Sequence, residues 1–158
     1  MKTDSQILAN LNEMLALELT SINRYFLHAR MHGNWGFEAL NKRNFKKSIK
    51  DMKQADELIE RILMLEGLPN LQKLGALQIG EDTAEMFQCD ASFQTMQITA
   101  LKNAISVCES MQDFVSRAIL EGILSYEEDH LDWIETQQYQ IGQMGVDLYL
   151  QAQISEGE

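Results

Sequence analysis

A glutamate and a histidine interrupt the apolar stripe of one long amphipathic segment. Glu127 and His130 lie three residues apart, and the helical period places both on the face that should point inward. The stripe consists of Leu120, Ile123, Glu127, His130, Ile134 and Ile141. Charged groups on a buried face are costly unless something pairs with them. A carboxylate and an imidazole in this position therefore predict a metal site in the interior.

Three other periodic segments also carry polar residues on their apolar stripes. These residues are, in chain order, Glu18, then Asp51 with Gln54, then Gln94. Four-helix proteins that bind two irons take one Glu from each of two helices and a Glu-x-x-His pair from each of the others. Here Asp51, Gln54 and Gln94 stand where a Glu, a His and a Glu are expected. Iron is the first hypothesis, at a site with an altered set of ligands.

The apolar periodicity predicts an all-α protein with four long helices and a short fifth. The expected ranges are about 4–34, 38–65, 83–110, 112–145 and 146–153, with Thr83 as an N-cap and a first stripe of Ile7, Leu11, Leu15, Ile22 and Phe26. The linker over residues 67–82 is long enough to cross the whole bundle, whereas the other connections are short. This pattern predicts an up-down-down-up four-helix bundle with one long crossover between the second and third helices.

Length and charge narrow the class of protein. The 158 residues suit a single domain over 1–158, and a net charge of −11 argues against a nucleic-acid partner. The first residues lack the apolar core of a signal peptide, and no run is apolar enough to span a bilayer. We therefore expect a cytoplasmic protein without a membrane partner.

Several stretches of the chain resemble the bacterioferritin family. They are residues 23–31 (NRYFLHARM), 34–36 (NWG), 60–71 (ERILMLEGLPNL), 127–133 (EEDHLDW) and 149–153 (YLQAQ). The resemblance implies a ferritin-like bundle and an octahedral 24-subunit shell that oxidises Fe²⁺ and stores iron as ferric mineral. It also implies haem b at twofold interfaces and an electron donor such as a ferredoxin.

The family's ferroxidase ligands map onto six positions of this chain. These positions are Glu18, Asp51, Gln54, Gln94, Glu127 and His130. Two irons need four carboxylates and two imidazoles, and carboxamides are weak substitutes for either. The residual metal ligands are Glu18, Asp51, Glu127 and His130. The degraded positions are Gln54 and Gln94. No residue is assigned as catalytic. Alternatively, the two glutamines hydrogen-bond the remaining carboxylates as a satisfied polar network.

Four lysines lie beside these positions, at 46, 47, 50 and 53. Their positive charge disfavours iron and points to the same degraded centre. We expect the lysine side chains to form a solvated face.

Met52 belongs to a second apolar line on the same helix as Asp51. This line contains Phe45, Ile49, Met52, Ile59 and Leu63. A helix with two apolar faces must bury both, and residues near a twofold axis meet their own copies. By resemblance to bacterioferritins, Met52 from each of two subunits would ligate the iron of haem b.

Three functions remain open at this stage. The leading hypothesis is a haem-binding iron-storage subunit that oxidises Fe²⁺ poorly alone and co-assembles with a ferroxidase-competent subunit in a mixed shell. The second is a self-sufficient ferroxidase that tolerates the three altered positions. The third is a non-enzymatic structural subunit of the cage.

Overall fold

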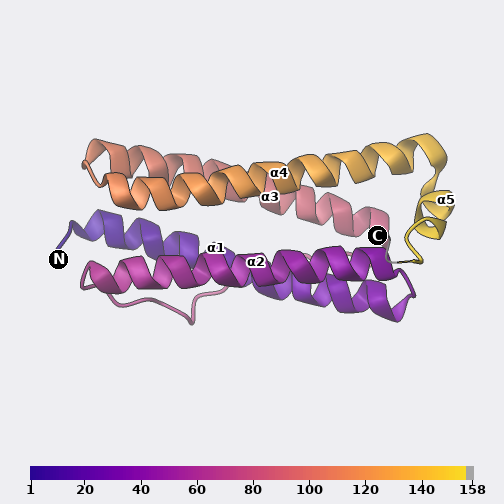
Figure 1. The fold of residues 1–158 in the computed structure, drawn as a ribbon, viewed down its shortest axis with the longest axis horizontal. Helices are drawn as coiled ribbons and strands as arrows, with labels where there is room; N and C mark the ends of the chain where they lie inside the picture. Colours follow the sequence, from indigo (N-terminus) through magenta and orange to yellow (C-terminus); the bar gives the residue numbers. More distant parts are fainter. Residues whose placement is uncertain (156–158) are drawn as a thin grey trace.

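The computed structural model describes residues 1–155 and shows four long helices with a short fifth (Figure 1). The elements are α1 (Ser5–Asn34), α2 (Glu38–Met64), α3 (Thr83–Ser110), α4 (Phe114–Met144) and α5 (Val146–Gln151). The predicted fold class is confirmed. Residues 156–158, which the expected single domain includes, lie outside the described part. No helix within 1–155 combines the length and apolarity needed to cross a membrane.

An aspartate caps the N-terminus of three of the long helices. The carboxylates of Asp4, Asp82 and Asp113 accept backbone N–H groups at 2.8, 2.9 and 3.0 Å. Such N-caps satisfy donors that the first helical turn leaves unpaired. The expectation that Thr83 caps α3 was wrong, because Asp82 holds that position and Thr83 is the first helical residue.

The long helices form two antiparallel pairs, α1 with α2 and α3 with α4 (Figure 1). The crossover over residues 65–82 runs back along the bundle, so that α3 is parallel to α2. Four side chains of α1 bond its backbone, those of Asn12, Thr20, Arg24 and His28. Arg24 Nη1 donates to the carbonyl of Gln78 at 2.6 Å, and Thr20 Oγ1 accepts from the N–H of Gly75 at 2.8 Å. His28 Nε2 lies 2.7 Å from the carbonyl oxygen of Ile79.

Two apolar clusters occupy opposite parts of the bundle. The larger cluster includes Leu11 and Leu15 of α1, Leu58 and Ile62 of α2, Leu101 of α3, and Leu120 and Ile123 of α4. The smaller cluster contains Leu40, Phe87, Ile134 and Tyr149. Along α2, α3 and α4 the candidate site residues fall between members of the two clusters. The structure therefore has a polar layer enclosed by apolar packing on both sides.

One predicted core residue is on the surface. Phe26 is 48% exposed, whereas its neighbour Tyr25 is fully buried. The predicted stripe spaced its last members by four residues, but 3.6 residues per turn moves the buried position back to Tyr25. This shift places a phenol beside the polar layer and an aromatic ring on the outside.

The short helix α5 packs against the end of the bundle. Gly145 has a φ of +80°, which a residue with a side chain rarely adopts, and it turns the chain from α4 into α5. The buried Tyr149 then donates its hydroxyl to Gln137 Oε1 at 2.6 Å. The tail is thereby anchored to α4, and its end pairs with the start of α2 through the N–H of Ala39 and the carbonyl of Gln153.

Candidate functional site

The polar layer contains buried side chains from all four long helices. They are Glu18, Ser21 and Tyr25 of α1; Lys47, Asp51 and Gln54 of α2; Gln94 and Gln97 of α3; and Glu127 and His130 of α4. Every one of these side chains is at most 4% exposed. All six positions predicted from the sequence are thus brought together. Ser21, Lys47 and Gln97 were not predicted as members of the site.

Three carboxylates form the centre of the layer. Glu18, Asp51 and Glu127 each offer an oxygen atom, and these atoms lie within 4.8 Å of one another. This is the one group of acidic, histidine or cysteine ligands within residues 1–155 that is close enough to share a metal ion. His130 is not a member of that group, although it lies in the same layer.

A lysine ammonium group lies between two of these carboxylates. Lys47 Nζ donates to Glu127 Oε1 at 2.6 Å and Oε2 at 3.1 Å, and it also donates to the Asp51 carboxylate. The expectation of a solvated lysine face was wrong for Lys47, which is 1% exposed, although Lys46, Lys50 and Lys53 are exposed. Lys47 precedes Asp51 by four residues, so both side chains lie on the inward face of α2.

The two glutamines at altered positions hydrogen-bond the carboxylates. Gln54 Nε2 donates to Glu18 Oε2 at 3.1 Å, and Gln94 Nε2 donates to Glu127 Oε2 at 3.2 Å. Gln97 Nε2 donates to the other oxygen of Glu18 at 2.8 Å. Both carboxylates are therefore held by amide N–H groups, as the polar-network alternative predicted. The amide oxygens of Gln94 and Gln97, atoms that could bind a metal, accept hydrogen bonds from Tyr25 and Gln94 instead.

Two hydroxyl groups complete this network. Tyr25 donates its hydroxyl to Gln94 Oε1 at 2.8 Å, and Ser21 donates to Asp51 Oδ2. Ser21 follows Glu18 by three residues, and Gln97 follows Gln94 by three. This spacing on a helix face is a signal that could have identified both.

His130 is the one member whose hydrogen-bonding atoms lack partners. Neither Nδ1 nor Nε2 bonds to another described residue, although both atoms are buried. The ring packs edge-on against Tyr25 with centroids 5.0 Å apart and stacks on Trp133 at 5.7 Å. Burial, assisted by the positive charges of Lys47 and Arg43, lowers the pKa of His130 well below its ordinary value. The imidazole is therefore neutral and able to offer a lone pair.

Burial and neighbouring charges shift the pKa values of three groups in the layer, Lys47, Asp51 and Glu18. Burial lowers the pKa of Lys47, but the Asp51 and Glu127 carboxylates outweigh that effect and raise the pKa above its ordinary value. Burial raises the pKa of Asp51 to about 7 despite the adjacent ammonium. Burial and then Asp51 raise the pKa of Glu18 well above the usual range for a glutamate. Lys47 therefore stays protonated, whereas Asp51 and Glu18 ionise less readily than exposed carboxyl groups do.

Met52 lies on the outer side of α2 and away from the layer. Its side chain is 52% exposed, and Leu63 on the same side is 56% exposed. Phe26 of α1 adjoins this side through Phe45, with ring centroids 6.4 Å apart. We call this surface the Met52 face; its members are Phe26, Phe45, Ile49, Met52, Ile59 and Leu63, all exposed or half-buried. The second apolar line predicted for α2 is thus present and open in a single chain.

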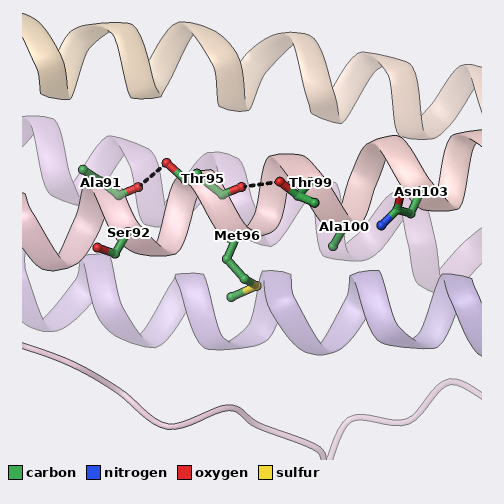
Figure 2. A pocket seen from close by; sticks show the side chains of 7 residues that line it. All are labelled: Ala91, Ser92, Thr95, Met96, Thr99, Ala100 and Asn103. Carbon is green, nitrogen blue, oxygen red and sulfur yellow. Dashed lines mark hydrogen bonds between the residues drawn. The ribbon is translucent and has the colours of Figure 1, made fainter.

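A broad surface cavity of about 720 Å³ lies along α3 (Figure 2). Uncharged side chains line it, and the hydroxyls of Thr95 and Thr99 donate to carbonyls of their own helix at 2.8 and 3.1 Å. None of its lining residues belongs to the polar layer, and none carries a titratable group. It offers no reactive centre.

The bundle and its buried carboxylate layer define a ferritin-like protein, and the ferritin-like domain family matches residues 8–144. Bacterioferritin from Mycobacterium leprae is 42% identical over 149 residues, which cover 94% of each chain. Bacterioferritin from Streptomyces coelicolor is 39% identical over 156 residues, covering 99% of this chain and 93% of the relative. The chain therefore belongs to the bacterioferritin family. The family resemblance read from the sequence is confirmed.

Proposed function

We propose that the chain is a haem-binding subunit of an iron-storing bacterioferritin shell, and that it oxidises Fe²⁺ slowly on its own. Membership of the bacterioferritin family supports iron storage and assembly into a shell. Slow oxidation is the finer part of the proposal. It rests on one observation, the position of Lys47 between Asp51 and Glu127.

The residues of the layer do not fit a pair of iron ions. Two Fe²⁺ ions bring four positive charges, and the layer has three carboxyl groups, of which two already bond the Lys47 ammonium. A second cation next to that ammonium would be repelled strongly in a buried site. Gln54 and Gln94 also direct N–H groups, which cannot bind a metal, at Glu18 and Glu127. The layer is therefore better suited to holding the four helices together than to oxidising Fe²⁺ rapidly.

The Met52 face supports the haem part of the proposal. A thioether is a soft ligand that suits haem iron, and Met52 is open on an apolar surface of the single chain. A twofold contact through this face would bring Met52 of one protomer near its own copy in the other. Haem bound there would supply a route for electrons into the shell, and a ferroxidase-competent relative in a mixed shell would supply oxidation.

A second candidate is a self-sufficient ferroxidase. The unpartnered ring nitrogens of His130 favour it, because a buried neutral imidazole without hydrogen bonds is a ready metal ligand. In this case Fe²⁺ as substrate would displace Lys47 from the carboxylates.

Stopped-flow oxidation of Fe²⁺ by the purified chain distinguishes the two candidates. We expect no fast phase at two irons per subunit, and we expect such a phase after co-expression with a ferroxidase-competent bacterioferritin. A fast phase in the chain alone would contradict the proposal and favour the self-sufficient enzyme. Haem and iron analysis of the same sample identifies a purely structural subunit, which would carry neither.

A further inference from the structure

We infer that the Lys47 ammonium is a built-in counter-ion that takes the place of a divalent cation, and that Lys47, more than Gln54 or Gln94, keeps metal out of the polar layer. The inference rests on the proposed function and deepens it, since it names the residue that controls the site. Three features of the structure support it: the position of the ammonium, its enclosure, and the donors that surround it.

The ammonium joins the helices that a shared metal ion would join. Lys47 contacts Asp51 on its own helix α2 and Glu127 on α4. Both acids belong to the trio whose oxygen atoms lie within 4.8 Å of one another. The positive charge therefore lies among the oxygen atoms that would otherwise converge on a metal.

The ammonium is also enclosed on its other sides. Lys47 Nζ lies 4.9 Å from the ring centroid of Tyr25 and 5.1 Å from that of Tyr126. Cations bind aromatic faces at distances up to about 6 Å. Because the whole side chain is buried, these contacts hold the charge in the layer. The lysine is part of the packed interior.

The glutamines exclude metal less firmly than the lysine. A carboxamide can rotate and present its oxygen to a cation, whereas a protonated amine has no lone pair to offer. Residue types alone suggest that Asp51→Glu, Gln54→His and Gln94→Glu together would restore a metal centre. We expect that triple variant to remain inactive while Lys47 is present, because its ammonium would still lie among the carboxylates.

Removal of the ammonium would leave a set of donors suited to one ion. Glu18, Asp51 and Glu127 would then have no cation among them. Zn²⁺ and Co²⁺ accept carboxylate oxygens as ligands, and the oxygens of these three acids are close enough together to share one ion. A variant without the lysine should therefore take up a single divalent ion and depend on it.

The test compares Lys47→Met with Lys46→Met in the assembled protein. Lys46 is the adjacent residue on α2 and is exposed, so its variant controls for the loss of one positive charge. Equilibrium dialysis with Co²⁺ should show one additional ion per subunit in Lys47→Met, bound at least tenfold more tightly than any ion in the wild type. The visible absorption of the bound Co²⁺ reports its coordination by the carboxylates. Co²⁺ should raise the Tm of Lys47→Met and leave the Tm of Lys46→Met and of the wild type unchanged.

Three results would overturn the inference, and the first two concern the uptake of Co²⁺. One is a folded Lys47→Met variant that takes up no more Co²⁺ than the control, and the other is equal uptake by the wild type. If Lys47→Met does not fold without metal, refolding with Co²⁺ should recover it, and failure to recover also overturns the inference. The double variant Lys47→Met/Glu127→Gln, with the ammonium and one of its partners both removed, should fold without metal and bind no additional Co²⁺.

The proposed function fails separately from this inference. Fast oxidation by the wild type would contradict the proposed function whatever the variants do. Slow oxidation by the wild type, together with a folded Lys47→Met that binds no Co²⁺, would overturn only the role given to Lys47.

Discussion

At the residue scale, one ammonium group joins carboxylates on two helices inside the bundle. Removing ions from water is costly, and a buried pair offsets this cost only where the geometry is good and each partner has further hydrogen bonds. Asp51 has Ser21, and Glu127 has Gln94, as a second donor. The layer meets these conditions, so the loss of one member should cost more than the pair contributes.

Replacement of Lys47 by Met should lower the free energy of unfolding in the absence of metal by about 3–5 kcal/mol, because it leaves buried carboxylates without their cation. The control Lys46→Met should change it by less than ~0.5 kcal/mol, as is usual for an exposed position. Denaturant unfolding with EDTA present measures both. Equal stability of the two variants would show that Lys47 is not needed to neutralise the layer.

Replacement of Met52 by Leu tests the haem ligand. The change conserves volume and typically costs under about 1.5 kcal/mol, so the variant should fold and assemble. It should lose the haem absorption band, because leucine has no atom that can bind iron. Met96→Leu is a control, since Met96 is an exposed methionine on α3, whereas the Met52 face belongs to α1 and α2. Retention of haem with an unchanged spectrum in Met52→Leu would exclude Met52 as the axial ligand.

The sequence predicted the acids of the layer but not its cation. Glu18, Asp51 and Glu127 were identifiable because each breaks an apolar stripe, and a buried acid needs a partner. Lys47 lies on the same stripe, one turn before Asp51, but its exposed neighbours suggested a solvated face. Burial of a lysine depends on acids from distant parts of the chain, here Glu127, and one segment alone cannot reveal them.

At the element scale, His32 connects α1 to the start of α3. Its Nδ1–H donates to the carbonyl of His28 at 2.9 Å, and its Nε2 lies 3.2 Å from the hydroxyl of Thr83. Burial, despite the hydrogen bond to His28, lowers the pKa of His32 to about 4. The folded protein therefore holds this imidazole neutral, whereas the unfolded chain protonates it near pH 6.5.

This difference predicts a loss of stability in mild acid. Below pH 6.5 the unfolded chain binds a proton that the folded protein refuses until about pH 4, so stability falls as the pH falls through this window. For His32 alone the loss should reach about 1.4 kcal/mol at pH 5.5. His32→Gln should lose that part of the pH dependence between pH 7.5 and 5.5. An unchanged pH profile of denaturant unfolding in this variant would contradict the assignment.

The helix ends could be predicted from local sequence signals more accurately than the burial of individual side chains. The apolar periodicity lies within single segments, so the predicted helix ends fall within about two residues of those observed. Over a 30-residue helix the buried face drifts away from a strict four-residue spacing. For this reason Tyr25 is buried and Phe26 is exposed, whereas the predicted stripe contained Phe26. The docking of α5 through Tyr149 and Gln137 depends on how α4 and α5 meet, which no single segment determines.

At the scale of the whole molecule, the Met52 face leaves large apolar side chains open to water. Contiguous apolar patches of this kind mark interaction surfaces. An isologous contact through the face would bury both copies and join α2 of one protomer to α2 of its partner. A haem that bridges two methionines, as the proposed function requires, would depend on the same contact.

A charge placed on this face should separate the protomers. The wild type should sediment and scatter light as a large closed assembly at micromolar concentration. Leu63→Glu should shift it toward monomers and remove haem, because a carboxylate at the contact loses its water without gaining a partner. Met52→Leu keeps the face apolar and is the matched control, since it should lose haem but stay assembled. A wild type that sediments as a stable monomer would exclude the shell. A Leu63→Glu variant that stays fully assembled with its haem would place the subunit contact elsewhere.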